Sequence, residues 1–226
     1  MPLALLALDT STIACSAALL QNDVIIERFI TEPRQHAYSL LPFIDSVLQE
    51  AKRDLAQCDA IAFGEGPGSF TGLRIAISVA QGLAFGSGKP LIPVSSLHIL
   101  AQSLYRLHQV TSVYIAVDAR MEEVYFAHYQ LDKKTGLMQA IIKDCLLKPE
   151  DVPAFNDLDV HLGGDAWDVY EVLHDRAQQI PLQHVYPDIY PHAYDLAVIA
   201  ADLFLQGKAI DPQQASPVYL REKVTA

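Results

Sequence analysis

The sequence predicts an α/β protein built as two lobes, each with its own sheet. Apolar runs of strand length alternate along the 226 residues with segments of helical spacing, as is typical of this class. The stretches LLALDTS and YIAVDAR share one design, an apolar strand that ends in an aspartate before a polar turn. Asp9 and Asp118 take matching places, so we interpret the two passages as a structural duplication with a boundary near 108–112. Coincidence is the alternative.

The elements follow from apolar spacing and turn residues. Pro42 falls near the first turns of one helix, where proline is tolerated best. We expect lobes over 1–108, with a helix at 193–210 packing back on it, and 109–192, then a tail at 211–226. The expected elements are strands over 3–20 and 23–30, a helix over 36–51, a strand over 58–66, a helix over 72–85, a strand and helix over 90–107, strands over 113–131, a strand, glycine turn and helix over 161–175, and a helix over 193–207.

Composition limits the function classes. The net charge of −11 argues against a protein that holds nucleic acid alone, although work on RNA beside a basic partner stays compatible with it. Cys15, Cys58 and Cys145 form no C-x-x-C pair, which suits a reducing compartment. The N-terminus has no basic leader and no apolar run is long enough for a bilayer. We therefore expect a soluble cytoplasmic protein.

Residues 64–86 read GEGPGSFTGLRIAISVAQGLAFG, a glycine-rich turn that runs into an apolar helix. Such a turn can hold phosphate at the helix N-terminus, or it can let two helices pack closely. The spacing excludes a Walker A loop, a dinucleotide fingerprint and a nucleophile elbow. We expect Thr71 to cap the helix and Gly86 to end it.

The helix that follows carries apolar or small residues on most of its sides. A helix of this kind is buried all round, or it is buried on one side by a partner. A core helix and a partner-binding helix both remain open at this point.

The blocks LALDTSTIACSAAL, HAYSLLPFIDSVL, GPGSFTGLRIAISVAQGLA, PVSSL, VDARMEEVYFA and PVYLR together resemble the bacterial TsaB family, also called YeaZ. The resemblance implies a two-lobed actin/Hsp70-like (ASKHA) fold with duplicated ribonuclease-H-like sheets. It implies a non-catalytic subunit in the synthesis of threonylcarbamoyladenosine at position 37 of tRNA. The implied partners are a catalytic TsaD-type paralogue and a TsaE-type ATPase that acts through the complex. The resemblance implies only indirect contact with tRNA, a possible homodimer when the chain is alone, and no membrane association.

TsaB is similar to TsaD, which carries a metal-binding H-x-x-x-H after a stretch like PLIGVN. Laid on PLIPVSSLHIL, that motif places Ser96 and Leu100 where the two histidines fall. Neither residue replaces an imidazole as a transition-metal ligand. We therefore expect no metal.

A nucleotide site is the second hypothesis. Asp9, Thr10 and Ser11 match the first phosphate loop of the actin-like fold, although they suit an ordinary turn as well. Gly163, Gly164 and Asp165 stand where this fold places an adenosine-contacting turn, and a plain turn before a helix is an equal alternative. We expect no required cofactor and at most weak binding of ATP or ADP. The alternative function is an independent ATPase or kinase-like protein.

The loop after the second duplicated strand lacks the glycines that let a backbone approach phosphate. Arg120 there suits an internal salt bridge or a partner contact. A peptidase is a third hypothesis, but the sequence offers no nucleophile–base pair or metal site for it, and we expect no catalytic residue.

We expect the partner to bind the helix from His36 to Ala51 together with the helix from Gly72 to Phe85. The candidate interface residues are His36, Leu40, Leu41, Ile44, Leu73, Arg74, Ile77, Ala80 and Ala84.

Overall fold

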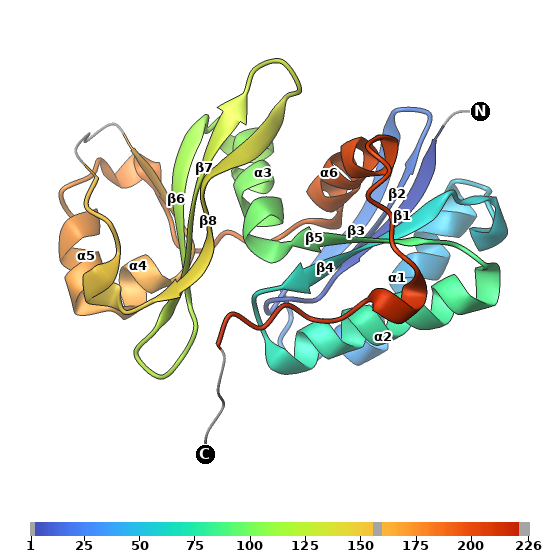
Figure 1. Cartoon of the computed structure of the whole chain (residues 1–226), viewed down its shortest axis with the longest axis horizontal. Helices are drawn as coiled ribbons and strands as arrows, with labels where there is room; N and C mark the ends of the chain where they lie inside the picture. Colours follow the sequence, from blue (N-terminus) through green and yellow to red (C-terminus); the bar gives the residue numbers. More distant parts are fainter. Residues whose placement is uncertain (1–2, 156–159, 222–226) are drawn as a thin grey trace. The chain divides into compact units, whose positions relative to one another are not determined.

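Figure 1 shows the computed structural model, which describes residues 3–155 and 160–221. The described residues fall into two units. The first holds those up to Ile99 together with Pro191–Val218, and the second holds Leu100–Tyr190 together with the tail from Tyr219. The boundary between the two units falls inside a helix, between Ile99 and Leu100, which is earlier in the chain than the boundary expected near 108–112.

The first unit contains a five-stranded mixed sheet in the order β3-β2-β1-β4-β5. The first three strands form an antiparallel meander, and β4 and β5 run parallel to β1. The side chains of β1 are all buried, so its continuous apolar run is that of a central strand. The strands are β1 (Ala4–Asp9), β2 (Cys15–Gln21), β3 (Val24–Ile30), β4 (Ala60–Gly66) and β5 (Leu91–Ser95).

Helices cover both faces of this sheet. Figure 1 shows α1 and α2 on one face and α6 on the other. The underside of α1 and α2 packs on β2 and β4 in a core that includes Phe63. The helices are α1 (His36–Glu50), α2 (Phe70–Ser87) and α6 (Ala193–Leu205), with short 3₁₀ turns η1 (Leu55–Gln57) and η4 (Pro212–Gln214).

The ends of α2 differ from the prediction. The cap is Ser69, not Thr71, because the Ser69 hydroxyl accepts a hydrogen bond from the N–H of Gly72. The helix continues past Gly86 to Ser87, and Gly88 takes the left-handed conformation that ends it.

The second unit repeats the sheet topology of the first. Its order is β10-β9-β6-β7-β8, with an antiparallel meander β6-β7-β8 and with β9 and β10 parallel to β6. The predicted α/β class and the duplicated sheets are confirmed. The strands are β6 (Ser112–Asp118), β7 (Val124–Asp132), β8 (Leu137–Leu147), β9 (His161–Gly163) and β10 (Val185–Tyr186).

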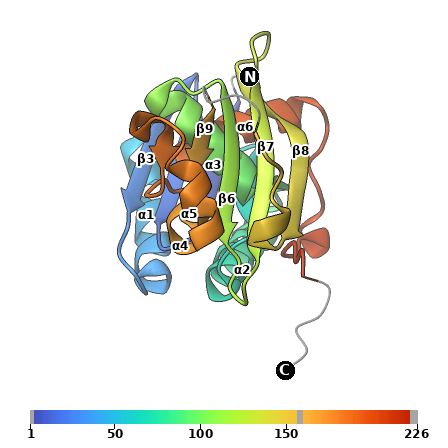
Figure 2. The ribbon, with the colours of Figure 1, turned by 90° about the vertical axis from the view of Figure 1, so that its left-hand side faces the viewer.

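Figure 2 faces the second unit and shows α4 and α5 in front of its sheet. Trp167 is buried between these helices and the sheet, and its Nε1 donates to the carbonyl of Gly163 at 3.1 Å. On the other face a side chain on Gly163 would meet Leu100 and Leu104 of α3. The helical elements are α3 (Ser96–His108), which crosses the unit boundary, α4 (Ala166–Val169), α5 (Glu171–Ala177), η2 (Pro149–Asp151) and η3 (Leu182–His184).

No helix within 3–155 or 160–221 is long and apolar enough to cross a membrane. The predicted tail lies partly at 222–226, outside the described residues.

Candidate functional site

The first candidate site is the segment Asp9–Thr12, which comprises the last residue of β1 and the loop after it, and its side chains are hydrogen-bonded inside the protein. Asp9, Thr10 and Ser11 are buried. The Asp9 Oδ1 atom accepts hydrogen bonds from the Ser11 N–H at 3.0 Å and the Ser11 hydroxyl at 2.9 Å. The Thr10 hydroxyl donates to the carbonyl of Gly72 at 2.7 Å. The hydroxyls of Thr10 and Ser11 therefore both donate their hydrogen bonds to groups inside the protein.

The glycines at 68 and 72 let the start of α2 lie directly against this loop. A Cβ on Gly68 would stand 2.3 Å from the Ser11 carbonyl oxygen, and one on Gly72 would stand 1.9 Å from that of Thr10. The Ser69 N–H donates to the Ser11 carbonyl at 2.7 Å. The glycines therefore serve a close backbone contact between the loop and α2.

Two buried polar atoms, one from Asp9 and one from Ser96, lie near each other beside this loop. In the part of the chain that the structure describes, Asp9 Oδ2 and Ser96 Oγ are both buried without a hydrogen-bond partner. A Cβ on Gly64 would lie 1.9 Å from that Asp9 oxygen and 3.6 Å from the Ser96 oxygen, so the missing side chain makes room for both. Burial raises the pKa of Asp9 from its ordinary 3.8 to about 6, against the lowering effects of the Ser11 hydrogen bonds and of His192.

This geometry bears on the nucleotide hypothesis. The Thr10 and Ser11 hydroxyls already donate to Gly72 and Asp9, so they could contact a phosphate only by breaking these hydrogen bonds. A nucleotide at this loop stays a prediction.

The second predicted nucleotide turn, at residues 163–165, is also built into the fold. Gly164 has φ +102°, and a Cβ there would lie 2.3 Å from the Ala116 carbonyl oxygen. The Asp165 carboxylate accepts from the N–H of Asp118 at 2.9 Å, and burial raises its pKa. The turn therefore packs on β6 and connects β9 to α4.

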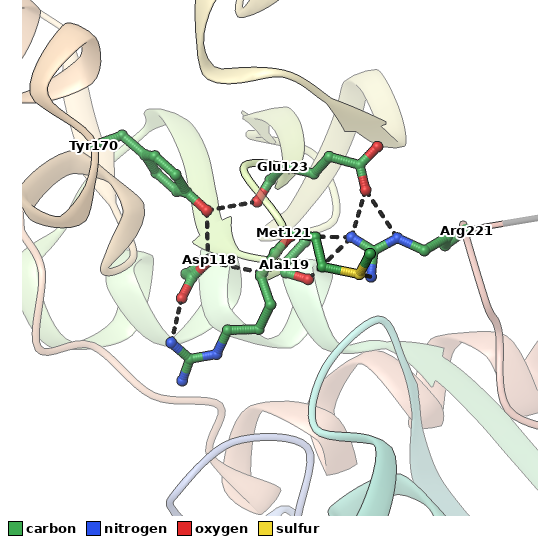
Figure 3. Close-up of polar contacts among 7 residues, drawn as sticks. Asp118, Ala119, Met121, Glu123, Tyr170 and Arg221 are labelled. Atoms are coloured by element: carbon green, nitrogen blue, oxygen red, sulfur yellow. Dashed lines mark hydrogen bonds and ion pairs between the residues drawn. The ribbon is translucent and has the colours of Figure 1, made fainter. Parts of the chain in front are cut away.

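Figure 3 shows the turn between β6 and β7. Arg120 forms an ion pair with Asp118 at 2.7 Å, which is the first of the two roles, an internal salt bridge or a partner contact, that the sequence left open for it. The Tyr170 hydroxyl donates to Asp118 Oδ1 at 2.8 Å. Burial and the nearby Asp118 raise the pKa of Tyr170 to about 12.

The same turn is held from the C-terminal tail, a role that the sequence analysis missed. Residues 120–122 all have positive φ angles of 57–62°, which non-glycine residues rarely adopt. The Arg221 guanidinium pairs with Glu123 and donates to the carbonyls of Ala119 and Arg120 at 3.2 and 3.1 Å (Figure 3). The block PVYLR, which carried part of the family resemblance, was the only signal for this contact.

The exposed face of α1 and α2 is the second candidate site, and we call it the α1–α2 face. It holds a hollow of about 540 Å³ between the two helices. Leu41 and Phe70 at its edge are 52% and 55% exposed, and the Arg74 guanidinium lies 3.8 Å from the centre of the Phe70 ring. The residues lining the hollow are His36, Ala37, Leu40, Leu41, Phe70, Thr71, Arg74, Ile75, Ser78 and Val79.

Several predicted interface residues lie on the other side of these helices. Their apolar stripe packs on the unit's own sheet, so their burial corrects the prediction that they form an exposed surface. Of the predicted set, Leu41 and Arg74 are exposed and His36 is half-buried. The residues assigned to the core alone are Ile44, Leu73, Ile77, Ala80 and Ala84, whereas Leu40 is buried and also lines the hollow.

The positions aligned with the TsaD histidines hold no ligand set. Ser96 and Leu100 are both buried. Within the described ranges, no group of three His, Cys, Asp or Glu side chains could hold a metal ion.

Comparison with known proteins agrees with this architecture. A family model described as TsaD, tRNA N6-adenosine threonylcarbamoyltransferase, matches residues 25–222. The tRNA threonylcarbamoyladenosine biosynthesis proteins TsaB of Escherichia coli K12 and Haemophilus influenzae are 36% and 38% identical, over 97% and 99% of this chain and 95% of each relative. A solved structure of YeaZ from Pseudomonas aeruginosa is 42% identical and matches with a TM-score of 0.86 over 96% of this chain and 100% of its own. The duplicated fold, the GPGSFTGLR block and these near full-length matches together establish that the chain belongs to the TsaB (YeaZ) family.

Proposed function

We propose that this protein is a non-catalytic subunit for the threonylcarbamoylation of adenosine 37 in tRNA. In this proposal it binds a TsaD-type catalytic paralogue through the α1–α2 face and holds that paralogue in its working conformation. Two full-length relatives are named for threonylcarbamoyladenosine biosynthesis, which supports the pathway. A TsaE-type ATPase acts on the assembled pair, tRNA is contacted only through the complex, and the complex works in the cytoplasm.

The α1–α2 face is the observation that carries the proposal. Phe70 and Leu41 are large apolar side chains more than half exposed beside a hollow, which is how anchor sites for partner side chains are built. Tyr38 on α1 is 78% exposed and extends the same helix surface. A helical surface of the partner, or in its absence a second copy of this chain, fits such a face.

The proposed absence of catalysis rests on the chemistry of the loops. Asp9 is buried behind hydrogen bonds to Ser11, and Ser96 takes the place of an imidazole. No cofactor is required by this assignment.

The test measures binding to the purified TsaD-type protein of the same organism. Leu41→Asp places a charge on the face and should weaken binding at least about tenfold, because interface anchors commonly carry 1.4 kcal/mol or more. Leu205→Asp is the matched control, since Leu205 is 79% exposed at the end of α6 on the other face of the sheet. Equal binding by the two variants would contradict the assigned face.

The pathway is tested separately in cells depleted of the protein. Nucleoside mass spectrometry of bulk tRNA should show a selective fall in threonylcarbamoyladenosine, restored by wild type and by Leu205→Asp and not by Leu41→Asp. An unchanged level would overturn the tRNA assignment.

The second candidate is an independent nucleotide-binding protein, which the Asp9–Thr10–Ser11 sequence keeps open. Magnesium-dependent ATP binding by the isolated chain, abolished in Asp9→Ala and retained in Leu41→Asp, would favour it.

A further inference from the structure

The loop after β1 is hydrogen-bonded to the first residues of both helices of the α1–α2 face. On the α2 side, the Thr10 hydroxyl donates to the Gly72 carbonyl at 2.7 Å and the Ser69 N–H donates to the Ser11 carbonyl at 2.7 Å. On the α1 side, Nε2 of His36, the first residue of α1, donates to the Thr12 carbonyl at 2.9 Å. One short loop therefore contacts the starts of two helices that are far apart in the sequence.

We propose that residues Asp9–Thr12 form a positioning loop, which sets the starts of α1 and α2 against each other and so shapes the hollow of the α1–α2 face. This inference rests on the proposed function, because the shape matters only if a partner binds there. Residues that match the phosphate loop of the actin-like fold would act here through protein–protein contact.

The contacts on both sides of the loop suit this role. Gly68 and Gly72 allow contact so close that a methyl group at either position would collide with a loop carbonyl, so the backbones of the loop and of α2 pack directly against each other. Asp9 fixes the loop from behind by accepting both hydrogen bonds from Ser11. The hollow begins at His36 and Thr71, within one turn of these contacts.

Among the described residues, both charged and uncharged groups lie near Asp9. Cys15 of β2 and His192 before α6 are the titratable groups that interact with it. The neighbours from β4 and α3 are Gly64 and Ser96, which carry no charge. The positioning role therefore follows from hydrogen bonds and packing.

The test compares two buried hydroxyls of the first unit. Thr10→Val keeps the side-chain shape and removes the donor to Gly72. Ser16→Ala removes the hydroxyl that accepts from the Ala193 N–H at 3.0 Å, at the start of α6, away from the α1–α2 face. Both variants lose one buried hydrogen bond, so both should melt at a lower temperature than wild type.

Binding to the purified TsaD-type protein separates them. We expect Thr10→Val to raise the dissociation constant at least about fivefold and Ser16→Ala to change it less than about twofold, with Thr10→Ser, which restores the hydroxyl, close to wild type. If Thr10→Val does not fold, Thr10→Ala removes the same donor and takes its place.

The outcomes are distinguishable. Wild-type protein that fails to bind the TsaD-type partner defeats the proposed function itself. Wild-type binding with equal effects of the Thr10 and Ser16 variants overturns only the positioning loop, and so does a loss that Thr10→Ser does not rescue.

Discussion

Asp9 should make the stability of the protein depend on pH in an unusual direction. Its carboxyl group is wholly buried, and its Oδ2 atom has no hydrogen-bond partner in the described part of the chain. Burial raises its pKa from 3.8 to about 6. Asp9→Asn keeps an oxygen to accept from Ser11 and places a neutral amide beside Ser96, so it removes the charge with little change of shape.

The sign follows from proton linkage. The folded state binds the Asp9 proton more tightly than the unfolded state, so its stabilising effect is complete below about pH 4 and is lost as the pH rises through about 6. The shift of roughly two units corresponds to about 3 kcal/mol, at 1.36 kcal/mol per unit. Ionised Asp9 should therefore cost about 3 kcal/mol above pH 6.

Urea unfolding of wild type and Asp9→Asn between pH 4.5 and 8 measures this directly. Relative to its value at low pH, the difference in the free energy of unfolding should be about 1 kcal/mol in favour of Asp9→Asn at pH 4.5, where the unfolded carboxyl is already mostly ionised, and should grow to about 3 kcal/mol by pH 7.5. Other carboxylates titrate equally in both proteins and cancel in the difference. Parallel pH curves would refute the reasoning, because they would mean that Asp9 ionises as easily in the folded protein as in the unfolded chain.

Three further predictions concern glycines, thiols and the tail. Gly72→Ala should lower the free energy of unfolding by about 3 kcal/mol or more, because its methyl group collides with a backbone carbonyl; Gly82→Ala, whose methyl group meets nothing, should raise it by about 0.5–1 kcal/mol in the same urea assay. Burial raises the pKa of Cys15 to about 12 and of Cys58 to about 11, so both should react with Ellman's reagent at pH 8 only as the protein unfolds; fast labelling in the native state would contradict this. Arg221→Ala should speed amide hydrogen exchange in the β6–β7 turn, and unchanged rates would show that the turn holds its conformation without the tail.

The duplicated architecture could be predicted because its signals are local. Each half begins with an apolar strand, an aspartate and a polar turn, and in each half this strand pairs antiparallel with the next and parallel with a later one. An internal salt bridge was one of two roles expected of Arg120, and the structure identifies Asp118, two residues earlier in the same turn, as the acidic partner.

The partner-binding residues could not be predicted in the same way. An all-apolar helix has two candidate stripes, and only the positions of the strands decide which stripe is core. Ile77 lies on the side that meets the sheet, whereas Phe70 and Val79 border the exposed hollow. The ends of α2 were missed for a related reason, because Ser69 and Thr71 are both good caps and Gly86 and Gly88 are both good terminators.

The glycine stretch shows why a motif can predict close contact without predicting the ligand. Glycines before a helix permit an oxygen to approach the backbone, and the helix N-terminus favours that oxygen electrostatically. A phosphate supplies such an oxygen, and so does a peptide carbonyl. Here the Ser11 carbonyl accepts from the Ser69 N–H at the start of α2, with Gly68 and Gly72 leaving the room. A glycine-rich turn of this type can therefore be filled by a carbonyl oxygen of a neighbouring loop in place of a phosphate oxygen. In this protein the contacts between that loop and the start of α2 can then help to orient α1 and α2 toward a partner.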